Sequence, residues 1–217
     1  MVAPQLPMTA KEAFNSVTES AIATIHIVDY DAPDTTRPAG MVRLSTPDTE
    51  ELTAELDGAS EWLRVACDEL LLAALARTIA KTLGDGVVPV DVASERGSML
   101  DAVPMLCATA QQADATQMLS GVHHLLTSAT ESIADGMSEV YFNYLGEVPE
   151  GSVPVPVQET PPGLGHALEL RVYRTEGRVH VDWWYDTSRF EAYTVEELTE
   201  QFPRALYEMT SDALPAL

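Results

Sequence analysis

Positive charge is scarce in this sequence. Its 217 residues include 12 Lys and Arg against 34 Asp and Glu, so the formal net charge at pH 7 is −22. No Lys or Arg occurs between Gly97 and Leu170. Nucleic acids and anionic membrane surfaces are both bound through cationic side chains. The composition therefore argues against both kinds of partner.

Cysteine and long apolar segments are scarce as well. Two cysteines, Cys67 and Cys107, make no disulfide framework for a chain of this size. No apolar run reaches the roughly 18 residues of a membrane-spanning helix. The N-terminal MVAPQLPMTAKEAF lacks the basic and then apolar pattern of a secretory signal. We therefore expect a cytoplasmic protein with free thiols.

The common motifs for metals and cofactors are missing. The sequence has no Cys and His cluster with zinc-ligand spacing, no glycine-rich loop after a strand and no G-x-S-x-G. We therefore expect no metal and no resident cofactor.

Apolar residues make up 46% of the chain, which is enough for the packed core of a globular protein. Helices are predicted from Thr46 as the N-cap to a stop at Gly58, from Ala66 or Cys67 to Leu83-Gly84, over Thr116–Ile133 and over Thr194–Met209 with Thr194 as the cap. Strand patterns occupy Ala21–Tyr30, Val87–Val92, Val103–Thr109 and Glu139–Leu145.

The clearest pattern is HALELRVYRTEGRVHVDWWYD, two alternating runs around Glu176-Gly177. A tight turn at these two residues predicts a hairpin in which Tyr173 faces His180, Arg171 faces Asp182 and Glu169 faces Trp184. One face of the hairpin is apolar and the other polar, as in a sheet that helices cover on one side. The predicted fold is a single α/β (α+β) unit with a mixed, largely antiparallel sheet and helices packed on one face.

The order of four segments resembles the C-terminal half of the condensation and epimerization domains of nonribosomal peptide synthetases. The segments are CDELLLAALARTIAKTLG, VPVDVASERG, VYFNYLGE and LELRVYRTEGRVHVDWWYDTSRFEAYTVEELTEQFPRAL. FNYLG, at Phe142 to Gly146, is especially similar to the epimerization type. We therefore divide the chain into an N-terminal extension and connector, 1–40, and a lobe-like domain, 41–217.

The resemblance implies one lobe of a two-lobed, chloramphenicol-acetyltransferase-like fold with a tunnel for carrier-protein arms. The family's active histidine lies in an HHxxxDG motif on the other lobe. His123-His124 is followed by Leu-Leu-Thr-Ser and is not this motif. Three interpretations stay open: the chain is an excised fragment, a non-catalytic module that docks, or an enzyme that uses other residues.

Cys67 is the candidate nucleophile for a reaction that does without the HHxxxDG histidine. A thiol at the start of a buried helix lies at the positive end of the helix dipole, which favours the thiolate. A thiolate can take an acyl group from a carrier-bound thioester and pass it to an amine. The alternative is that Cys67 is a small buried hydrophobe, and Cys107 is predicted to be core.

His180, on the polar face of the hairpin, is the candidate base for this thiolate, with a solvent-facing strand histidine as the alternative. The acidic third member of this catalytic group could be any of four residues: Glu61, Glu69, Glu169 or Asp182. His166 lies in or near the long loop before the hairpin, and His26 cannot be placed.

The candidate substrate-binding residues are aromatic: Tyr144, Tyr173 and Trp184. Tyr144 matches the tyrosine that lines the family's tunnel, with ordinary packing as its alternative. Tyr173 and Trp184 share the polar face with His180, a surface that we expect to be an exposed cleft.

Two functions follow. The first is a carrier-protein-dependent enzyme that joins an acyl or aminoacyl thioester to an amine in antibiotic biosynthesis, with Cys67 as the nucleophile. The second is a non-catalytic half-domain that docks a carrier protein or pairs with a partner lobe or a second copy. In both, the phosphopantetheine arm belongs to the carrier protein, and no cofactor belongs to this chain.

Overall fold

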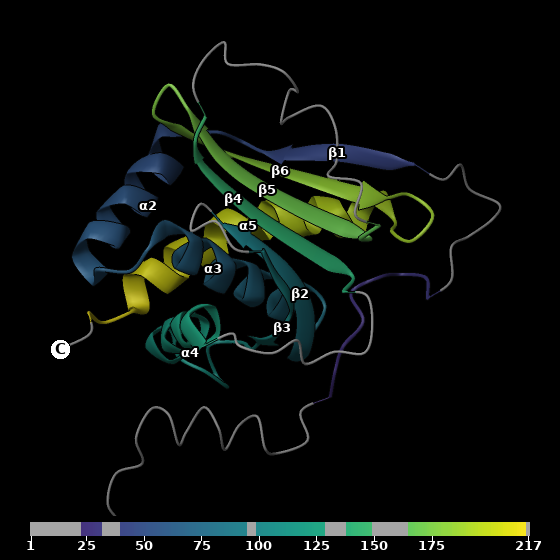
Figure 1. Ribbon diagram of the computed structural model, residues 1–217, viewed down its shortest axis with the longest axis horizontal. Helices are drawn as coiled ribbons and strands as arrows, with labels where there is room; N and C mark the ends of the chain where they lie inside the picture. The colour runs from purple at the N-terminus through teal and green to yellow at the C-terminus, as the bar shows by residue number, and fades with distance from the viewer. Residues whose placement is uncertain (1–22, 32–39, 95–98, 129–137, 149–164, 216–217) are drawn as a thin grey trace, which may run out of the picture.

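The computed structural model describes residues 23–31, 40–94, 99–128, 138–148 and 165–215, and these form one six-stranded sheet with helices packed against it (Figure 1). The strand order is β1-β6-β5-β4-β2-β3. The bounds are β1 Met41–Thr46, β2 Gly86–Ser94, β3 Met99–Cys107, β4 Val140–Glu147, β5 Leu168–Thr175 and β6 Arg178–Asp186. The sheet is mixed, because β4 runs parallel to both β2 and β5 while the other pairs are antiparallel.

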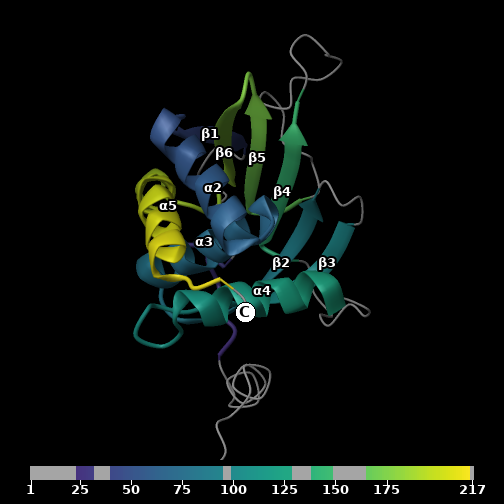
Figure 2. The same ribbon diagram turned by 90° about the vertical axis from the view of Figure 1, so that its left-hand side faces the viewer.

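The helices of the described part cover one face of this sheet (Figure 2). They are α2 Glu50–Leu63, α3 Cys67–Thr82, α4 Ala115–Ser128 and α5 Ala192–Asp212. α3 lies in the middle and packs against α5 and α4, and α5 also contacts β1. The predicted fold class, a mixed sheet with helices on one face, is therefore confirmed.

The β5–β6 hairpin forms with the predicted register. Glu176 and Gly177 both have positive φ, 51° and 72°, the backbone geometry of a tight two-residue hairpin turn. Tyr173 pairs with His180, and Glu169 pairs with Trp184. The Cα partners across the two strands thus match the sequence pattern residue for residue.

Helix α3 is the buried central helix that the sequence predicts. Every residue from Asp68 to Ala80 is buried, and Leu70 to Ala76 are fully inaccessible. Arg64, with φ 56°, ends α2 in the left-handed region, and the chain re-enters a helix at Cys67. Cys67 is therefore the first residue of α3.

The predicted start and end of the first helix were wrong. Thr46 ends β1, and its hydroxyl accepts a hydrogen bond from Trp183 Nε1 at 3.0 Å. Thr49 caps α2 instead, accepting from the backbone N–H of Leu52 at 3.1 Å. The helix continues through Gly58 because a buried stripe that ends at Leu63 holds it against the core.

Two further expectations need correction. α5 begins at Ala192, so Thr194 is inside the helix, where its hydroxyl donates to Asp29 at 3.1 Å. Residues 23–30 form no strand and make a single bridge, from Thr24 to Val87, with a bend at Asp29. The helix predicted beyond Ser128 and most of the loop over residues 147–165 lie outside the described residues.

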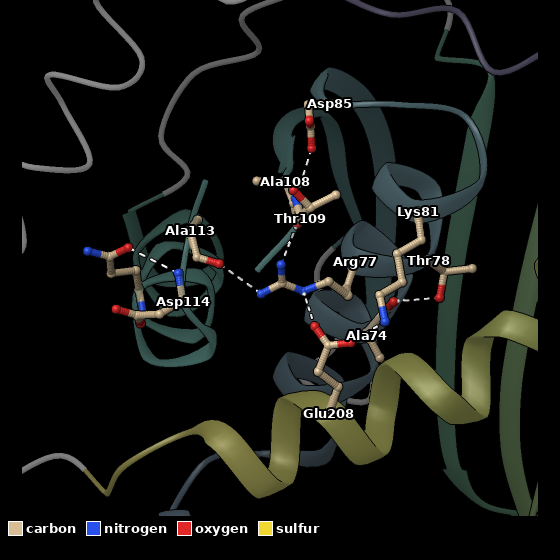
Figure 3. Close-up of polar contacts among 11 residues, drawn as sticks. Ala74, Arg77, Thr78, Lys81, Asp85, Ala108, Thr109, Ala113, Asp114 and Glu208 are labelled. Atoms are coloured by element: carbon tan, nitrogen blue, oxygen red, sulfur yellow. Dashed lines mark hydrogen bonds and ion pairs between the residues drawn. The ribbon is translucent and has the colours of Figure 1, made fainter. Parts of the chain in front are cut away.

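A buried arginine fastens α3 to its neighbours (Figure 3). Arg77, 1% exposed, donates to the carbonyl oxygens of Ala108 and Ala113, both at 2.8 Å. Its Nε lies 3.5 Å from Glu208 on α5. One side chain thus connects α3 to α5 and to the segment between β3 and α4.

Candidate functional site

The sheet face opposite the helices, which we call the open face, carries a polar and aromatic grid. Residues in register across five strands form its first row: Asp91, Tyr141, Glu169, Trp184 and Arg43. The next row is Asn143, Arg171, Asp182 and Ser45, and Tyr173 and His180 follow. Because side chains alternate along a strand, these groups all project to one side.

The open face is less exposed than the sequence led us to expect. Glu169, Arg171 and Asp182 are 1%, 5% and 3% exposed, so this part is a buried polar surface and not an exposed cleft. Buried charged groups are stable only when other charges or hydrogen bonds compensate them. The contacts of each group therefore decide what it can do.

One end of the open face is hollowed by a pocket of about 430 Å³. Its lining residues are Arg43, Ser45, Thr46, Asp48, Tyr173, His180, Val181 and Asp182. Asp182, one of these residues, accepts from Ser45 Oγ at 2.6 Å and from the Tyr173 hydroxyl at 3.1 Å. Arg43 Nη1 lies 3.8 Å from the same carboxylate. The pocket is thus lined mainly by polar groups that other residues hold in place.

His180 is oriented from both ring nitrogens. Its ring stacks on Tyr173 with centroids 5.1 Å apart. Nε2 is 2.7 Å from Thr175 Oγ1, and Nδ1 is 3.6 Å from Asp48 Oδ2. The sequence prediction that Tyr173 and His180 lie together is confirmed, and the two rings form one wall of the pocket.

Trp184 lies close to two guanidinium groups. The Cζ atoms of Arg43 and Arg171 are each 5.8 Å from the centre of its ring, which places both in cation–π range. The indole Nε1 is buried and has no hydrogen-bond partner. A buried donor without a partner costs free energy, so this N–H is available to a ligand or a water molecule.

Glu169 is the most perturbed acid of the open face. Burial raises its pKa to about 7, and the nearby Arg171 only partly opposes this shift. Burial in turn lowers the pKa of Arg171. Oε2 of Glu169 is buried without a hydrogen-bond partner. A carboxyl group that changes protonation near neutral pH is a feature of many functional sites.

Cys67 lies on the other side of the sheet, in a separate cluster. It is half-buried, and its Sγ is 3.9 Å from Nη2 of Arg174. Arg174 also forms a bidentate ion pair with Asp57 of α2. Burial lowers the pKa of Arg174, but hydrogen bonds to Asp57 and Tyr144 outweigh this effect and hold it above its ordinary value. The thiol therefore faces a firmly protonated guanidinium.

The structure does not bring Cys67 and His180 together. Arg174, which contacts Cys67, follows Tyr173 directly in β5, and Tyr173 stacks on His180. Consecutive strand residues point to opposite faces, so the sheet separates the thiol from the imidazole. Tyr144 is on the Cys67 side, where it is 4% exposed and packed in the core.

The remaining candidates occupy ordinary positions. Burial raises the pKa of the Cys107 thiol, which is fully inaccessible within the core. His123 Nδ1 lies 3.1 Å from Glu69 Oε1, and His26 Nδ1 lies 3.2 Å from Glu139 Oε1. Glu69 is thus occupied by His123 and does not assist His180.

The sequence analysis missed a cluster around Asp91. His166 Nε2 is 2.6 Å from Asp91 Oδ2, and Ser138 Oγ donates to Asp91 Oδ1 at 2.6 Å. These residues are 75 and 47 positions from Asp91, and no local motif links them. The parallel pairings of β2 with β4 and of β4 with β5 bring them together.

Two searches of the described residues were negative. No group of three or more His, Cys, Asp or Glu side chains there is arranged to hold a metal ion. Within the same residues, no helix has the length and apolar character needed to cross a membrane.

Comparison with known proteins gives polyketide synthase relatives. The chain is 37% identical to a subunit of the phenolphthiocerol/phthiocerol polyketide synthase of Mycobacterium tuberculosis and of Mycobacterium bovis, over 221 aligned residues and 81% of the chain. The chain spans only 15% of the length of these relatives. No family model matches the sequence.

Solved structures give the fold. The epimerization domain from the third module of tyrocidine synthetase B superposes with a TM-score of 0.61 at 14% identity, covering 93% of this chain and 55% of that chain. The condensation domain of monacolin K polyketide synthase gives 0.56 at 11% identity, with 86% and 50% covered. A structure described as the molecular basis for condensation domain-mediated chain release from the enacyloxin polyketide synthase superposes with a TM-score of 0.55 at 16% identity. The superposition covers 83% of this chain and 43% of that chain. The chain therefore has the fold of one lobe of a condensation- or epimerization-type domain.

Proposed function

We propose that this chain is a condensation-type lobe that works in polyketide or nonribosomal peptide assembly. In this role it binds the acyl group that a carrier protein presents on its phosphopantetheine arm and positions the thioester for transfer to an acceptor. The cofactor-like arm belongs to the carrier protein. The single observation that carries the proposal is the pocketed, polar open face on a lobe of this fold.

The chemistry of the pocket supports this role. A pantetheine arm carries amide groups and a phosphate, which need hydrogen-bond donors, acceptors and a cation. The pocket offers Arg43, which is 39% exposed at its side chain, together with the Tyr173 and His180 rings. An arginine can hold a phosphate through paired hydrogen bonds, and aromatic rings pack well against a flexible arm.

A second lobe is part of the proposal. The chain covers 55%, 50% and 43% of the three solved structures named above, so it matches about half of each. We propose that the other half of the module comes from another part of the synthase or from a second copy of this chain. The amine acceptor would bind at the junction.

The test is binding to a carrier protein loaded with an acyl-pantetheine arm. We expect Arg43→Ala to weaken binding about tenfold or more, since it removes the cation of the pocket. Arg204→Ala is the matched control, because Arg204 is exposed on α5, on the helix side of the sheet. Equal binding by both variants, or no binding by the natural chain to any loaded carrier, would reject the proposal.

A second function is favoured by the position of Cys67. Cys67 is a half-buried thiol at the first residue of α3, and its Sγ lies 3.9 Å from Nη2 of Arg174, so the nucleophile is next to a cation that can hold an anionic group of a substrate. The thiolate would attack the thioester carbonyl, the bond from the carbonyl carbon to the pantetheine sulfur would break, and an acyl-Cys67 would form. An amine would then take the acyl group to give an amide and return the thiol.

This second function needs no help from His180. Its test is mass spectrometry of the chain after incubation with an acyl-loaded carrier protein. An added acyl mass that maps to Cys67 and is absent from Cys67→Ser supports it. Full condensation activity in Cys67→Ala would end the proposal for the cysteine while leaving the binding role intact.

A further inference from the structure

The two outer edges of the sheet differ in how they are protected against a further strand (Figure 1). β3 forms one edge, and Pro104 lies within it opposite Pro89 of β2. Neither proline has a backbone N–H, so this pair makes no ladder hydrogen bond, and Pro104 faces outwards with no donor to offer. Proline on an edge strand is one of the ways in which proteins prevent further pairing. The β3 edge is therefore protected.

The other edge, β1, lacks this protection. Its six residues, Met41–Thr46, contain no proline, and their pairing with β6 has no register shift. No further strand lies beyond β1 among the described residues. An edge strand without a proline or a bulge presents its outer backbone groups as a template for another strand.

The register shows which backbone groups of β1 point outwards. Thr187 N–H, just after β6, donates to the carbonyl oxygen of Gly40 at 3.1 Å, so Gly40 is a hydrogen-bonded position of this ladder. Hydrogen-bonded positions recur at every second residue of an antiparallel pair. The groups that face β6 are therefore those of Val42, Leu44 and Thr46. The groups that face outwards are those of Met41, Arg43 and Ser45.

The side chains of β1 define the chemistry of a strand that could pair with it. Val42 and Leu44 lie on the helix side of the sheet, whereas Arg43 and Ser45 lie on the open face. Val42 is 42% exposed, Leu44 packs partly against the core, and the Arg43 side chain is 39% exposed. A neighbouring strand therefore gains contacts when it carries apolar residues beside Val42 and Leu44 and an acidic residue beside Arg43.

We propose that the β1 edge binds an extended segment of a partner protein by strand addition, and that apolar and acidic residues alternate in this segment. Backbone hydrogen bonds to the outward groups of β1 supply the affinity, and the alternating side chains supply the specificity. The added strand extends the open face next to the pocket that Arg43 and Ser45 line. Strand addition of this kind requires neither a carrier arm nor a reaction.

A second copy of this chain fits the edge less well than such a partner. Each copy carries a formal charge of −22, so two copies repel each other. In the antiparallel register that pairs all the outward groups of two β1 strands, the two Arg43 side chains lie opposite each other. Like charges at opposite positions are destabilising, and β1 contains no acidic residue to compensate them.

The test uses the synthetic peptide acetyl-STVEVTS-amide, whose two valines project to one side of a strand and whose glutamate projects to the other. The peptide sequence reads the same in both directions, so parallel and antiparallel pairing present the same pattern to β1. During a titration, nitrogen-15 NMR of the chain should show the largest amide shifts in β1. The amide hydrogens of Met41 and Ser45 should become protected from exchange. No change in β1 at millimolar peptide would overturn the proposal.

The charge requirement is tested with a second peptide, acetyl-STVKVTS-amide, in which lysine replaces the glutamate. We expect it to bind about threefold to tenfold more weakly, and Arg43→Gln should remove most of this difference. Arg178→Gln is the matched control, because Arg178 is exposed on β6 beyond the last residue that pairs with β1. Equal binding of the two peptides by the natural chain would overturn the proposal.

The backbone requirement is tested on both partners. Met41→Pro removes one outward N–H without a loss to the β6 ladder, so it should weaken binding about fivefold or more with little change in the thermal midpoint. Only alternate amides of an added strand face β1, so methylation of either the glutamate nitrogen or the two valine nitrogens should abolish binding, and methylation of the other set should not. Equal effects of the two methylation patterns would overturn the proposal.

Light scattering of the natural chain tests the competing occupant. We expect a monomer that binds the glutamate peptide. A dimer that Met41→Pro converts to a monomer would overturn the proposal, because it would assign the β1 edge to a second copy of this chain.

Discussion

Glu169 shows how the open face sets the chemistry of a single residue. It is fully buried, one of its oxygens has no hydrogen-bond partner, and burial raises its pKa from 4.5 to about 7. Arg171, two residues away on the same face, opposes this shift but does not cancel it. A carboxyl group in such a site is a stability liability whenever it is ionised.

Glu169→Gln should remove a pH-dependent loss of stability. A folded-state pKa above the unfolded value favours folding below about pH 4.5, and this contribution is lost as the pH rises through about 7. Relative to the variant, the natural chain should lose at most about 3 kcal/mol of unfolding free energy between about pH 5 and pH 8. Urea unfolding at both pH values measures the difference. The other acids titrate in both proteins, so their contributions cancel when the two unfolding free energies are subtracted. A difference in unfolding free energy that does not change with pH would contradict the prediction.

The two cysteines should differ sharply in reactivity. Cys107 is inaccessible and its thiol has a pKa raised by burial, whereas Cys67 is half-buried beside Arg174. Iodoacetamide should therefore modify the native chain at Cys67 and leave Cys107 intact until guanidinium unfolds it. Intact mass and peptide mapping give the result, and Cys67→Ser should show no native modification. Native labelling of Cys107 would contradict the assignment of that residue to the core.

At the scale of elements, α3 depends on one buried cation. Arg77 donates to the carbonyl oxygens of Ala108 and Ala113, so its loss removes this donor from two buried acceptors and also removes one of the cations beside Glu208. We expect Arg77→Met to lower the free energy of unfolding by about 3–5 kcal/mol. Lys81→Met is the matched control: Lys81 contacts the same Glu208 but is partly exposed, and its loss should cost about 1 kcal/mol or less. Similar losses in both variants would show that burial of Arg77 does not matter.

The sequence predicted those elements whose signals are local. Alternation around Glu176-Gly177 fixed the hairpin register, and the nearly continuous apolar run after Cys67 fixed α3. Helix caps were harder, since Thr46 and Thr49 are equally good caps by type. Tertiary contacts distinguish the two: Trp183 Nε1 donates a hydrogen bond to the Thr46 hydroxyl, which is therefore not available as a cap. The end of the helix was also missed, because the buried stripe of α2 continues beyond Gly58.

The candidate site could be predicted only in part. Tyr173 and His180 were found together because they are cross-strand neighbours. The pair of Asp91 and His166 was not found, because it depends on which strands lie side by side in the sheet. The separation of Cys67 from His180 also follows from strand alternation combined with the position of α3, which local motifs do not contain.

For the whole molecule, the arrangement is a sheet with two unlike faces. One face is closed by α2, α3, α4 and α5, which supply the apolar core. The open face holds polar and aromatic groups, several with buried atoms that lack partners. The apolar core stabilises the fold, so the open face is the part of this lobe that is left to bind a substrate or a second lobe.

The charge of the whole chain should also be visible in its stability. A formal charge of −22 on 217 residues repels itself in the compact state, and salt screens this repulsion. Raising NaCl from about 20 mM to about 200 mM should therefore increase the thermal midpoint by a few degrees, about 2–5 °C. KCl should act equally, since screening depends on ionic strength and not on the cation. A midpoint that falls with salt would mean that ion pairs such as Arg174–Asp57 outweigh the net repulsion.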